Sequence, residues 1–252
     1  MKAWQVKRLA DPSEALELVE IDEPQLEDGK VIIKVEAAAL NFFDILLCQG
    51  KYQVKPPLPF TPGAEISGTI AKAGPNSRFK VGERVFAQPQ LPNGGLSEYV
   101  AVDESNVFKM ADSMSFQEAA AMFVTYQTTY YALHYRAQLK RGETLLVHAG
   151  AGGVGSAAIQ LGKAAGAKVI ATAGGQEKVA VLRELGADVV IDYLSDDFVE
   201  IVKEETNGRG ADVIYDPVGG DVFHRSRKCI ALFSLSVLQA GGFLKLPSIT
   251  HL

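Results

Sequence analysis

The sequence predicts an α/β protein with a β-rich N-terminal part and a doubly wound parallel sheet in the C-terminal part. Three observations support this fold class. Short β-prone runs separated by proline and glycine fill the chain as far as Val102. A capping-box spacing, Ser115 to Glu118, then begins a helical stretch. From Thr144 onward, strand-like and helix-like segments alternate, which is typical of parallel strands with helices on both faces.

In the first part, many short strands with Gly and Pro between them suggest a barrel or a sandwich. The predicted strands are 16–21, 31–37, 66–73, 84–87 and 97–102. We predict a domain boundary where the pattern changes, with a first domain at residues 1–121 and a second at 122–252.

In the second part, an alanine-rich helix at 119–133 precedes the alternating segments. Four strands are predicted, and a fifth could come from 232–238, where Leu or Val alternates with Ser. The predicted strands are 144–148, 168–173, 188–192 and 212–216. The helices between them follow Gly155, cover 177–185, and start at Ser195, which we expect to be a helix cap.

Composition excludes several classes of protein. With 252 residues and 47% hydrophobic residues, the chain can bury a core in one large or two small domains. A net charge of −5 without a basic stripe argues against a nucleic-acid partner. No apolar run is long enough to span a bilayer or to form a signal peptide. The two cysteines, Cys48 and Cys229, form no metal or disulfide pattern, so we expect a cytoplasmic protein.

A dinucleotide-binding pattern follows the first strand of the second part. Gly150, Gly152 and Gly155 have the spacing G-x-G-x-x-G. The first glycine allows a tight turn, the second lets a pyrophosphate approach the backbone, and the third lets the helix pack closely on the strand. The strand before and the helix after are the context that such a motif requires. We therefore predict that the free N–H groups of this helix bind a dinucleotide.

The end of the second strand bears on which dinucleotide is bound. NAD sites usually place Asp or Glu there, but this strand ends at Ala173 and continues into Gly174 and Gly175. A carboxylate would repel a 2′-phosphate, so its absence permits NADPH, and Lys178 could supply a cation. Glu177 would favour NAD if it turned toward the ribose. We therefore expect the chain to bind NADPH in preference to NADH.

Four segments together resemble one family: LNFFD at 40–44, PGAEISG at 62–68, KVGERV at 80–85 and AGAGGVG at 149–155. They resemble the medium-chain dehydrogenase/reductase superfamily, in particular its zinc-independent NADPH:quinone oxidoreductase (zeta-crystallin-like) branch. The resemblance runs to about Ala231 and implies a GroES-like N-terminal domain followed by a Rossmann domain.

The resemblance to the zinc-independent branch depends on zinc ligands that this sequence lacks. Zinc-containing relatives have Cys where this chain has Asn41 and His where it has Ala64, and neither replacement is a strong zinc ligand. The four cysteines of the relatives' structural zinc loop are also missing between Gln88 and Asp103. We therefore expect no metal. Without zinc to polarise an alcohol, the resemblance implies hydride transfer from NADPH to a quinone or to an enone.

The resemblance also implies site residues. Asn41 and Asp44 are the implied catalytic residues near the nicotinamide, although Asp44 could equally cap a helix. Besides Gly150 and Gly155, the implied cofactor contacts are Asn41, Thr128, Gly152, Gly153, Val154, Gly174, Lys178 and Tyr193. His148, at the strand end beside the loop, is interpreted as structural rather than catalytic.

Three functions remain open. The first is an NADPH-dependent reductase of a small quinone or activated alkene, and the second is an enoyl-thioester reductase, because LNFFD also resembles enoyl reductase modules. The third is a non-catalytic dinucleotide-binding protein. It arises because family members are longer, and residues 239–252 leave no sequence for the sixth strand that forms the family dimer. We therefore expect a truncated or divergent C-terminus, a natural short form being the alternative, and no family-type homodimer.

Overall fold

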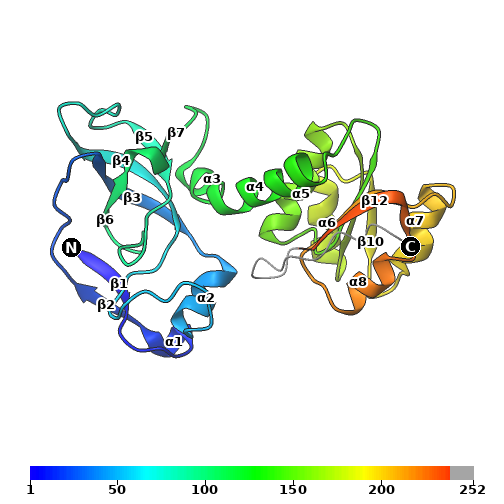
Figure 1. The fold of residues 1–252 in the computed structure, drawn as a ribbon, viewed down its shortest axis with the longest axis horizontal. Coiled ribbons are helices and arrows are strands. Elements are labelled where there is room, and N and C mark those ends of the chain that lie inside the picture. Colours follow the sequence, from blue (N-terminus) through cyan, green and yellow to red (C-terminus); the bar gives the residue numbers. More distant parts are fainter. Residues whose placement is uncertain (239–252) are drawn as a thin grey trace. The chain divides into compact units, whose positions relative to one another are not determined.

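The computed structural model describes residues 1–238 and divides the chain into two compact units. Unit 1 is Met1–Val124, and unit 2 begins at Thr125 (Figure 1). The predicted fold class is confirmed, because a β-rich first unit precedes a doubly wound, Rossmann-type second unit.

Unit 1 contains a five-stranded antiparallel sheet in the order β6-β3-β4-β5-β7 and a separate hairpin of β1 and β2. Alternate residues of its strands, among them Val31, Ile33 and Ile70, build its main core. Its strands are β1 Lys2–Val6, β2 Leu16–Glu20, β3 Lys30–Ala39, β4 Glu65–Ala73, β5 Arg84–Ala87, β6 Tyr99–Asp103 and β7 Val107–Lys109. Its helices are α1 Pro12–Ala15, α2 Phe42–Cys48, η1 Glu104–Asn106 and α3 Phe116–Ala120.

The predicted helix 119–133 is not continuous. The capping box at its start is confirmed, since Glu118 N donates to Ser115 Oγ and the Glu118 carboxylate accepts from Ser115 N. However, α3 ends at Ala120, and α4 Phe123–Tyr130 begins afresh and continues into the π-helical turn η2 Tyr131–Arg136. The new start is stabilised by Glu65 of β4, whose carboxylate accepts from Val124 N. Because these residues are 59 positions apart, the sequence around the helix does not reveal this contact.

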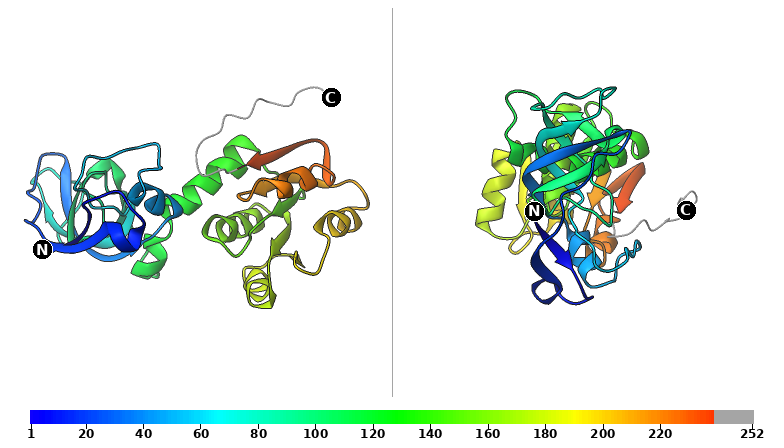
Figure 2. Two further views of the ribbon diagram at one scale, coloured as in Figure 1. Left: turned by 90° about the horizontal axis from the view of Figure 1, so that it is seen from below. Right: turned by 90° about the vertical axis from the view of Figure 1, so that its left-hand side faces the viewer.

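Unit 2 contains a five-stranded parallel sheet in the order β10-β9-β8-β11-β12. Its strands are β8 Thr144–Val147, β9 Lys168–Ala173, β10 Val189–Asp192, β11 Ala211–Asp216 and β12 Ile230–Leu238. Its helices, besides α4 and η2, are α5 Gly153–Ala164, α6 Gln176–Glu184, α7 Phe198–Glu205 and α8 Asp221–Ser226. Strand β12, red at the edge of this sheet in Figures 1 and 2, confirms 232–238 as part of a fifth strand.

Both faces of this sheet are covered. On one face, Leu145, Val169 and Tyr215 pack with Ile159 of α5 and Leu182 of α6. On the opposite face, the alternate strand residues form a second cluster with α7, built from Leu146, Ile170, Ile191, Phe198, Val199, Val202, Ile214 and Cys229. The strand order reverses between β8 and β11, so their carboxyl ends border the crevice where ligands of such sheets bind.

The predicted helix cap at Ser195 is wrong. Helix α7 begins at Phe198, and Asp197 caps it by accepting from Val199 N at 2.8 Å. Ser195 instead lies in the preceding turn, where its hydroxyl donates to the carbonyl of Asp192. Within residues 1–238, no helix is both long enough and apolar enough to cross a membrane. The expected absence of a sixth strand concerns 239–252, outside the described residues.

Candidate cofactor and catalytic site

The Gly-rich turn of unit 2 leaves the start of α5 open. After β8, Ala149 adopts a positive φ of 49°, and Gly150 N donates to Thr172 O at 2.9 Å. Gly152 is the N-cap residue of α5, and no side chain caps the helix there. The first N–H groups of α5 thus lie at a positive dipole end without a side-chain acceptor, an arrangement that fits an anionic phosphate.

The glycines of this turn have different reasons to be glycine. A Cβ on Gly155 would lie 2.2 Å from the backbone oxygen of Ala149, so the protein's own packing requires this glycine. One on Gly150 would lie 2.7 Å from Leu182 Cδ2, so the end of that side chain would have to shift. On Gly152 the nearest atom would be Ala149 O at 3.3 Å, a tight contact that a shift of a few tenths of an ångström would relieve. Packing therefore constrains Gly152 much less than Gly155, whereas a ligand approaching the backbone would require a glycine there. A Cβ on Gly153 would lie 3.1 Å from Thr125 Cγ2, which places the turn against α4.

Helix α4 contacts the start of α5 through Thr129, the neighbour of the predicted cofactor contact Thr128. Thr128 is half-buried. Thr129 is fully buried, and its hydroxyl donates to Val154 O at 3.4 Å and lies 3.2 Å from the Tyr215 hydroxyl. Burial raises the pKa of Tyr215 to about 12, so this phenol stays neutral. Thr129 was missed because both threonines suit a helix and only packing separates them.

The ends of β9 and β10 bring two predicted residues together. Gly174 follows β9, and a Cβ there would lie 2.6 Å from the Tyr193 hydroxyl oxygen. The Tyr193 side chain therefore covers Gly174 and is still half-exposed, at 51%. Lys178 lies exposed near the start of α6. Gly174, Lys178 and Tyr193 lie at the carboxyl ends of the strands of unit 2. The predicted residues Asn41 and Asp44 belong to unit 1.

An acid that the sequence reasoning missed lies at the same edge. Asp192 ends β10, and its carboxylate accepts from Gly175 N at 3.0 Å, Leu194 N at 3.1 Å and Gln176 Nε2 at 3.3 Å. The backbone donors lower the pKa of Asp192. Its charge is thus directed into the loop after β9, which it holds in place. The rule for NAD sites concerns only an acid at the end of the second strand, which here is β9.

In unit 1, Asp44 combines a cap with a tertiary contact. Its Oδ2 accepts from Asn41 N at 2.8 Å at the start of α2, and its Oδ1 accepts from Gly63 N at 3.3 Å. The carboxyl is buried, and this burial raises the pKa of Asp44 against the opposing effect of the two N–H donors. The cap interpretation therefore describes contacts that exist, while a catalytic role stays a prediction.

Glu65, which the sequence reasoning also missed, orients Asn41. Its Oε1 accepts from Asn41 Nδ2 at 2.7 Å, and its Oε2 accepts from Val124 N at 2.7 Å. Because a carboxylate only accepts, the amide of Asn41 must point its nitrogen at Glu65. Burial raises the pKa of Glu65, the N–H donors oppose the rise, and the charge of Asp44 adds to it. An acid within the otherwise apolar start of β4 was the available signal.

Asn41 and Ala64 occupy the positions where zinc-containing relatives have ligands. Among residues 1–238, no three His, Cys, Asp or Glu side chains gather as a possible metal site. Both cysteines are free and buried. The expectation of no metal stays a prediction.

Two family matches cover both units. Residues 27–112 match the alcohol dehydrogenase GroES-like domain, and residues 153–243 match the zinc-binding dehydrogenase family. The second match extends beyond Ala231, where we expected the resemblance to end.

Individual relatives narrow the family. A quinone oxidoreductase-like protein 2 homolog of Nematostella vectensis is 42% identical over 208 residues, which are 82% of this chain and 56% of that protein. A quinone oxidoreductase of Pongo abelii is 36% identical over 96% of this chain and 71% of its own length. The chain thus spans little more than half of the first relative and under three quarters of the second.

A solved structure gives the same result in three dimensions. The quinone oxidoreductase of Thermus thermophilus, whose structures include a complex with NADPH, superposes with a TM-score of 0.81 at 36% identity. The superposition covers 99% of this chain and 76% of that one. The chain therefore belongs to the medium-chain dehydrogenase/reductase superfamily, within its quinone oxidoreductase branch.

Proposed function

We propose that this chain is an NADPH-dependent oxidoreductase that reduces a small quinone or an activated alkene without zinc. The observation that carries the proposal is the open N-terminus of α5, where packing constrains Gly152 less than Gly155 and the backbone is free of a side chain. The relatives named quinone oxidoreductase support the reaction class.

The cofactor would be held by the Gly-rich turn and by the edge formed by β9 and β10. The turn, with Gly152, Gly153 and Val154, would take the pyrophosphate, and Gly174, Tyr193 and Lys178 would take the adenosine 2′-phosphate. The carboxylate of Asp192 accepts N–H groups of the loop after β9, and Lys178 would supply the positive charge for the phosphate. The NADPH complex of the Thermus thermophilus relative supports this preference. Bound NADPH supplies a hydride.

Unit 1 would then be the substrate and catalytic domain, and unit 2 the dinucleotide-binding domain. In unit 1 the contribution of Asn41 is its amide oxygen, because Glu65 holds the nitrogen end. Asp44 supports that geometry by fixing the backbone of Asn41. No side-chain acid is assigned to the proton that must follow the hydride, so solvent supplies it. The other proposed contact, Thr128, lies in α4 beside the buried Thr129.

Turnover decides between the three candidate functions. The purified 252-residue chain is mixed with NADPH and either phenanthrenequinone or a crotonyl thioester, and the loss of reduced cofactor is followed by absorbance. Reduction of the quinone supports the proposal. Reduction of the thioester alone would make the chain an enoyl-thioester reductase, and tight NADPH binding without turnover of either would make it a catalytically impaired binding protein.

A further inference from the structure

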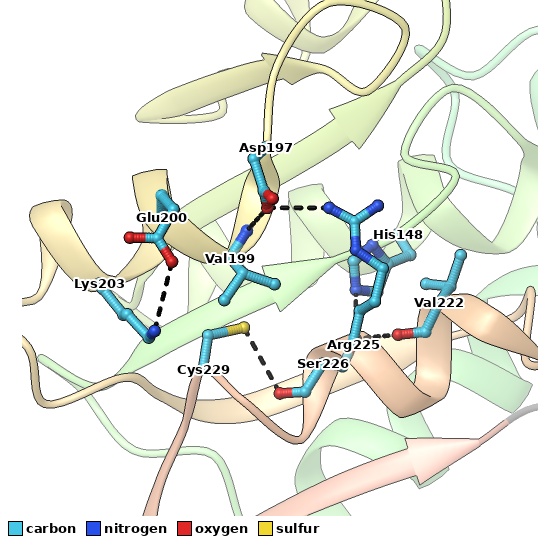
Figure 3. A network of polar contacts seen from close by, with 9 residues as sticks. All are labelled: His148, Asp197, Val199, Glu200, Lys203, Val222, Arg225, Ser226 and Cys229. Atoms are coloured by element: carbon cyan, nitrogen blue, oxygen red, sulfur yellow. Dashed lines mark hydrogen bonds and ion pairs between the residues drawn. The ribbon is translucent and has the colours of Figure 1, made fainter.

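A buried polar row lies at the carboxyl ends of the central strands of unit 2. His148 follows β8 directly, and its Nδ1 lies 3.1 Å from Thr172 Oγ1 of β9. Its Nε2 lies 2.9 Å from Ser226 Oγ of α8 (Figure 3). All three side chains are at most 2% exposed. The imidazole therefore joins the central strands to a helix that follows much later in the chain.

The hydrogen-bond directions along this row are determined. The Ser226 hydroxyl has one proton, which it donates to Val222 O at 2.7 Å, so it must accept from His148 Nε2–H. Burial lowers the pKa of His148 to about 4, so the ring is neutral at neutral pH and carries a single proton. With Nε2 protonated, Nδ1 accepts from the Thr172 hydroxyl. Every polar atom of the ring is thus satisfied in one tautomer.

The surroundings keep the ring from moving. It meets the Phe198 ring edge-on, with centroids 4.8 Å apart. The Arg225 guanidinium lies 4.7 Å from the centroid of Phe198 and donates to Asp197 at 2.8 Å, which joins α8 to the start of α7. Figure 3 shows Arg225, Ser226 and His148 close together. His148 consequently holds α8 at a fixed position beside β8.

Helix α8 in turn fixes the loop before it, residues 217–220. Asp216 ends β11, and its Oδ1 accepts from Val218 N at 2.9 Å and Gly219 N at 3.0 Å. Gly219 and Gly220 have positive φ values of 72° and 58°. The turn is therefore held at one end by Asp216 and at the other by α8.

This loop lies on the other side of the crevice from the carboxyl ends of β9 and β10, which we call the adenosine edge. In a doubly wound sheet the pyrophosphate lies at the glycine-rich turn and the adenosine ribose at the end of the next strand, here β9. A bound dinucleotide would cross the point where the strand order reverses, so its nicotinamide half would lie toward β11. The loop 217–220 follows β11.

We propose that His148 is a positioning residue which, through Ser226, sets the loop 217–220 relative to the Gly-rich turn and so determines affinity for the nicotinamide half of the dinucleotide. This inference rests on the proposed function, because it presupposes that unit 2 binds NADPH. It goes beyond that function by assigning a role to a buried side chain that does not touch the cofactor. The role is separable from general stability, because the adenosine edge is held by different residues, Asp192 among them.

Two substitutions of His148 separate its contacts. Asn places polar atoms near the position of Nδ1 and Gln near the position of Nε2, so His148→Gln keeps a donor for Ser226 and His148→Asn does not. Ser226→Ala removes the same contact from the other side and leaves the imidazole in place. Dissociation constants are measured on the full chain for NADPH and for adenosine 2′,5′-bisphosphate, which lacks the nicotinamide half. Melting temperatures are recorded alongside.

For His148→Asn and Ser226→Ala, we expect NADPH affinity to fall about tenfold, as for one lost hydrogen bond, with bisphosphate affinity unchanged. His148→Gln should retain NADPH affinity close to that of the wild type. Equal loss of both affinities in step with the melting temperature would mean that the row only stabilises the fold, and unchanged NADPH affinity in Ser226→Ala would also overturn the inference. If His148→Asn does not fold, Ser226→Ala and His148→Gln still decide. A wild-type chain that binds neither ligand would instead contradict the proposed function itself.

Discussion

The two units each contain a buried polar cluster, and the two clusters are built on opposite principles. In unit 1, the carboxylates of Glu65 and Asp44 are buried and accept N–H groups, so the cluster carries negative charge. In unit 2, His148 with Thr172 and Ser226 forms a neutral row of hydroxyls and imidazole. The stability of a charged cluster depends on each N–H donor that compensates the desolvation of its carboxylates. The stability of a neutral row depends on hydrogen bonds whose donors and acceptors point the right way. The two should therefore respond differently to substitution and to pH.

The largest expected effect comes from disturbing the turn beside His148 without touching either cluster. Gly155→Ala would bring a Cβ to 2.2 Å from the backbone oxygen of Ala149, which cannot move aside as a side chain can. We expect a loss of about 3 kcal/mol or more in the free energy of unfolding, measured by urea denaturation.

Gly152→Ala is the matched control, because its nearest contact would be 3.3 Å. It should leave the free energy of unfolding within about 1 kcal/mol and weaken NADPH binding instead. If Gly155→Ala were as stable as the wild type, the tight packing of α5 on the turn would be wrong.

In the charged cluster, Glu65→Ala leaves the Asn41 amide and the Val124 N–H without their acceptor. Unsatisfied buried groups cost about 1–3 kcal/mol each, and these two groups are only partly buried, so we expect a loss of about 2 kcal/mol of unfolding free energy. Glu65→Gln keeps one accepting oxygen and should lose about half as much. Equal losses in the two variants would show that the paired acceptors are not what stabilises the cluster.

Features formed by neighbouring residues could be predicted from the sequence, whereas both buried clusters depend on contacts between distant residues. The capping box at Ser115, the Gly-rich turn and the fifth strand could be predicted because each is encoded by neighbouring residues. The partners of Glu65 lie 24 and 59 residues away, and Ser226 lies 78 residues from His148. No periodicity reports such pairs. The short strands β1 and β7 were missed because their pairing partners, rather than their composition, define them.

The two clusters should also give opposite pH dependence. Folding raises the pKa of Glu65, so its contribution to stability is present below the unfolded pKa near 4.5 and is lost as pH rises through the folded value. Folding lowers the pKa of His148 from 6.5 to about 4, so its contribution is present above pH 6.5 and is lost as pH falls. That pKa difference corresponds to about 3 kcal/mol once both states are protonated.

Urea denaturation between pH 7 and pH 4.5 checks the signs, which we expect to be opposite. As pH falls, wild type should gain stability relative to Glu65→Gln and lose stability relative to His148→Gln. Parallel curves for wild type and His148→Gln would contradict a neutral, buried imidazole.

The smallest effect is expected at Asp216, where a charge borders the neutral row. Its Oδ2 is buried and has no hydrogen-bond partner among the described residues, while Oδ1 holds the loop. Asp216→Asn keeps the accepting oxygen and removes the buried charge, so stability at neutral pH should change by less than about 1 kcal/mol. It should also lower the pKa of His148 further, because the Asp216 charge raises it. An NMR titration of the imidazole checks this direction, and a higher pKa in the variant would contradict it.

The proposed function depends on the binding of NADPH by unit 2, through the Gly-rich turn and the carboxyl ends of β9 and β10. Direct titration of the full chain and of Lys178→Ala with NADPH and with NADH tests it most directly. We expect wild type to prefer NADPH, and Lys178→Ala to weaken NADPH by about ten- to a hundredfold while NADH changes little, because only NADPH has the 2′-phosphate. Equal weakening of the binding of both cofactors, or a wild-type preference for NADH, would contradict this mode of NADPH binding.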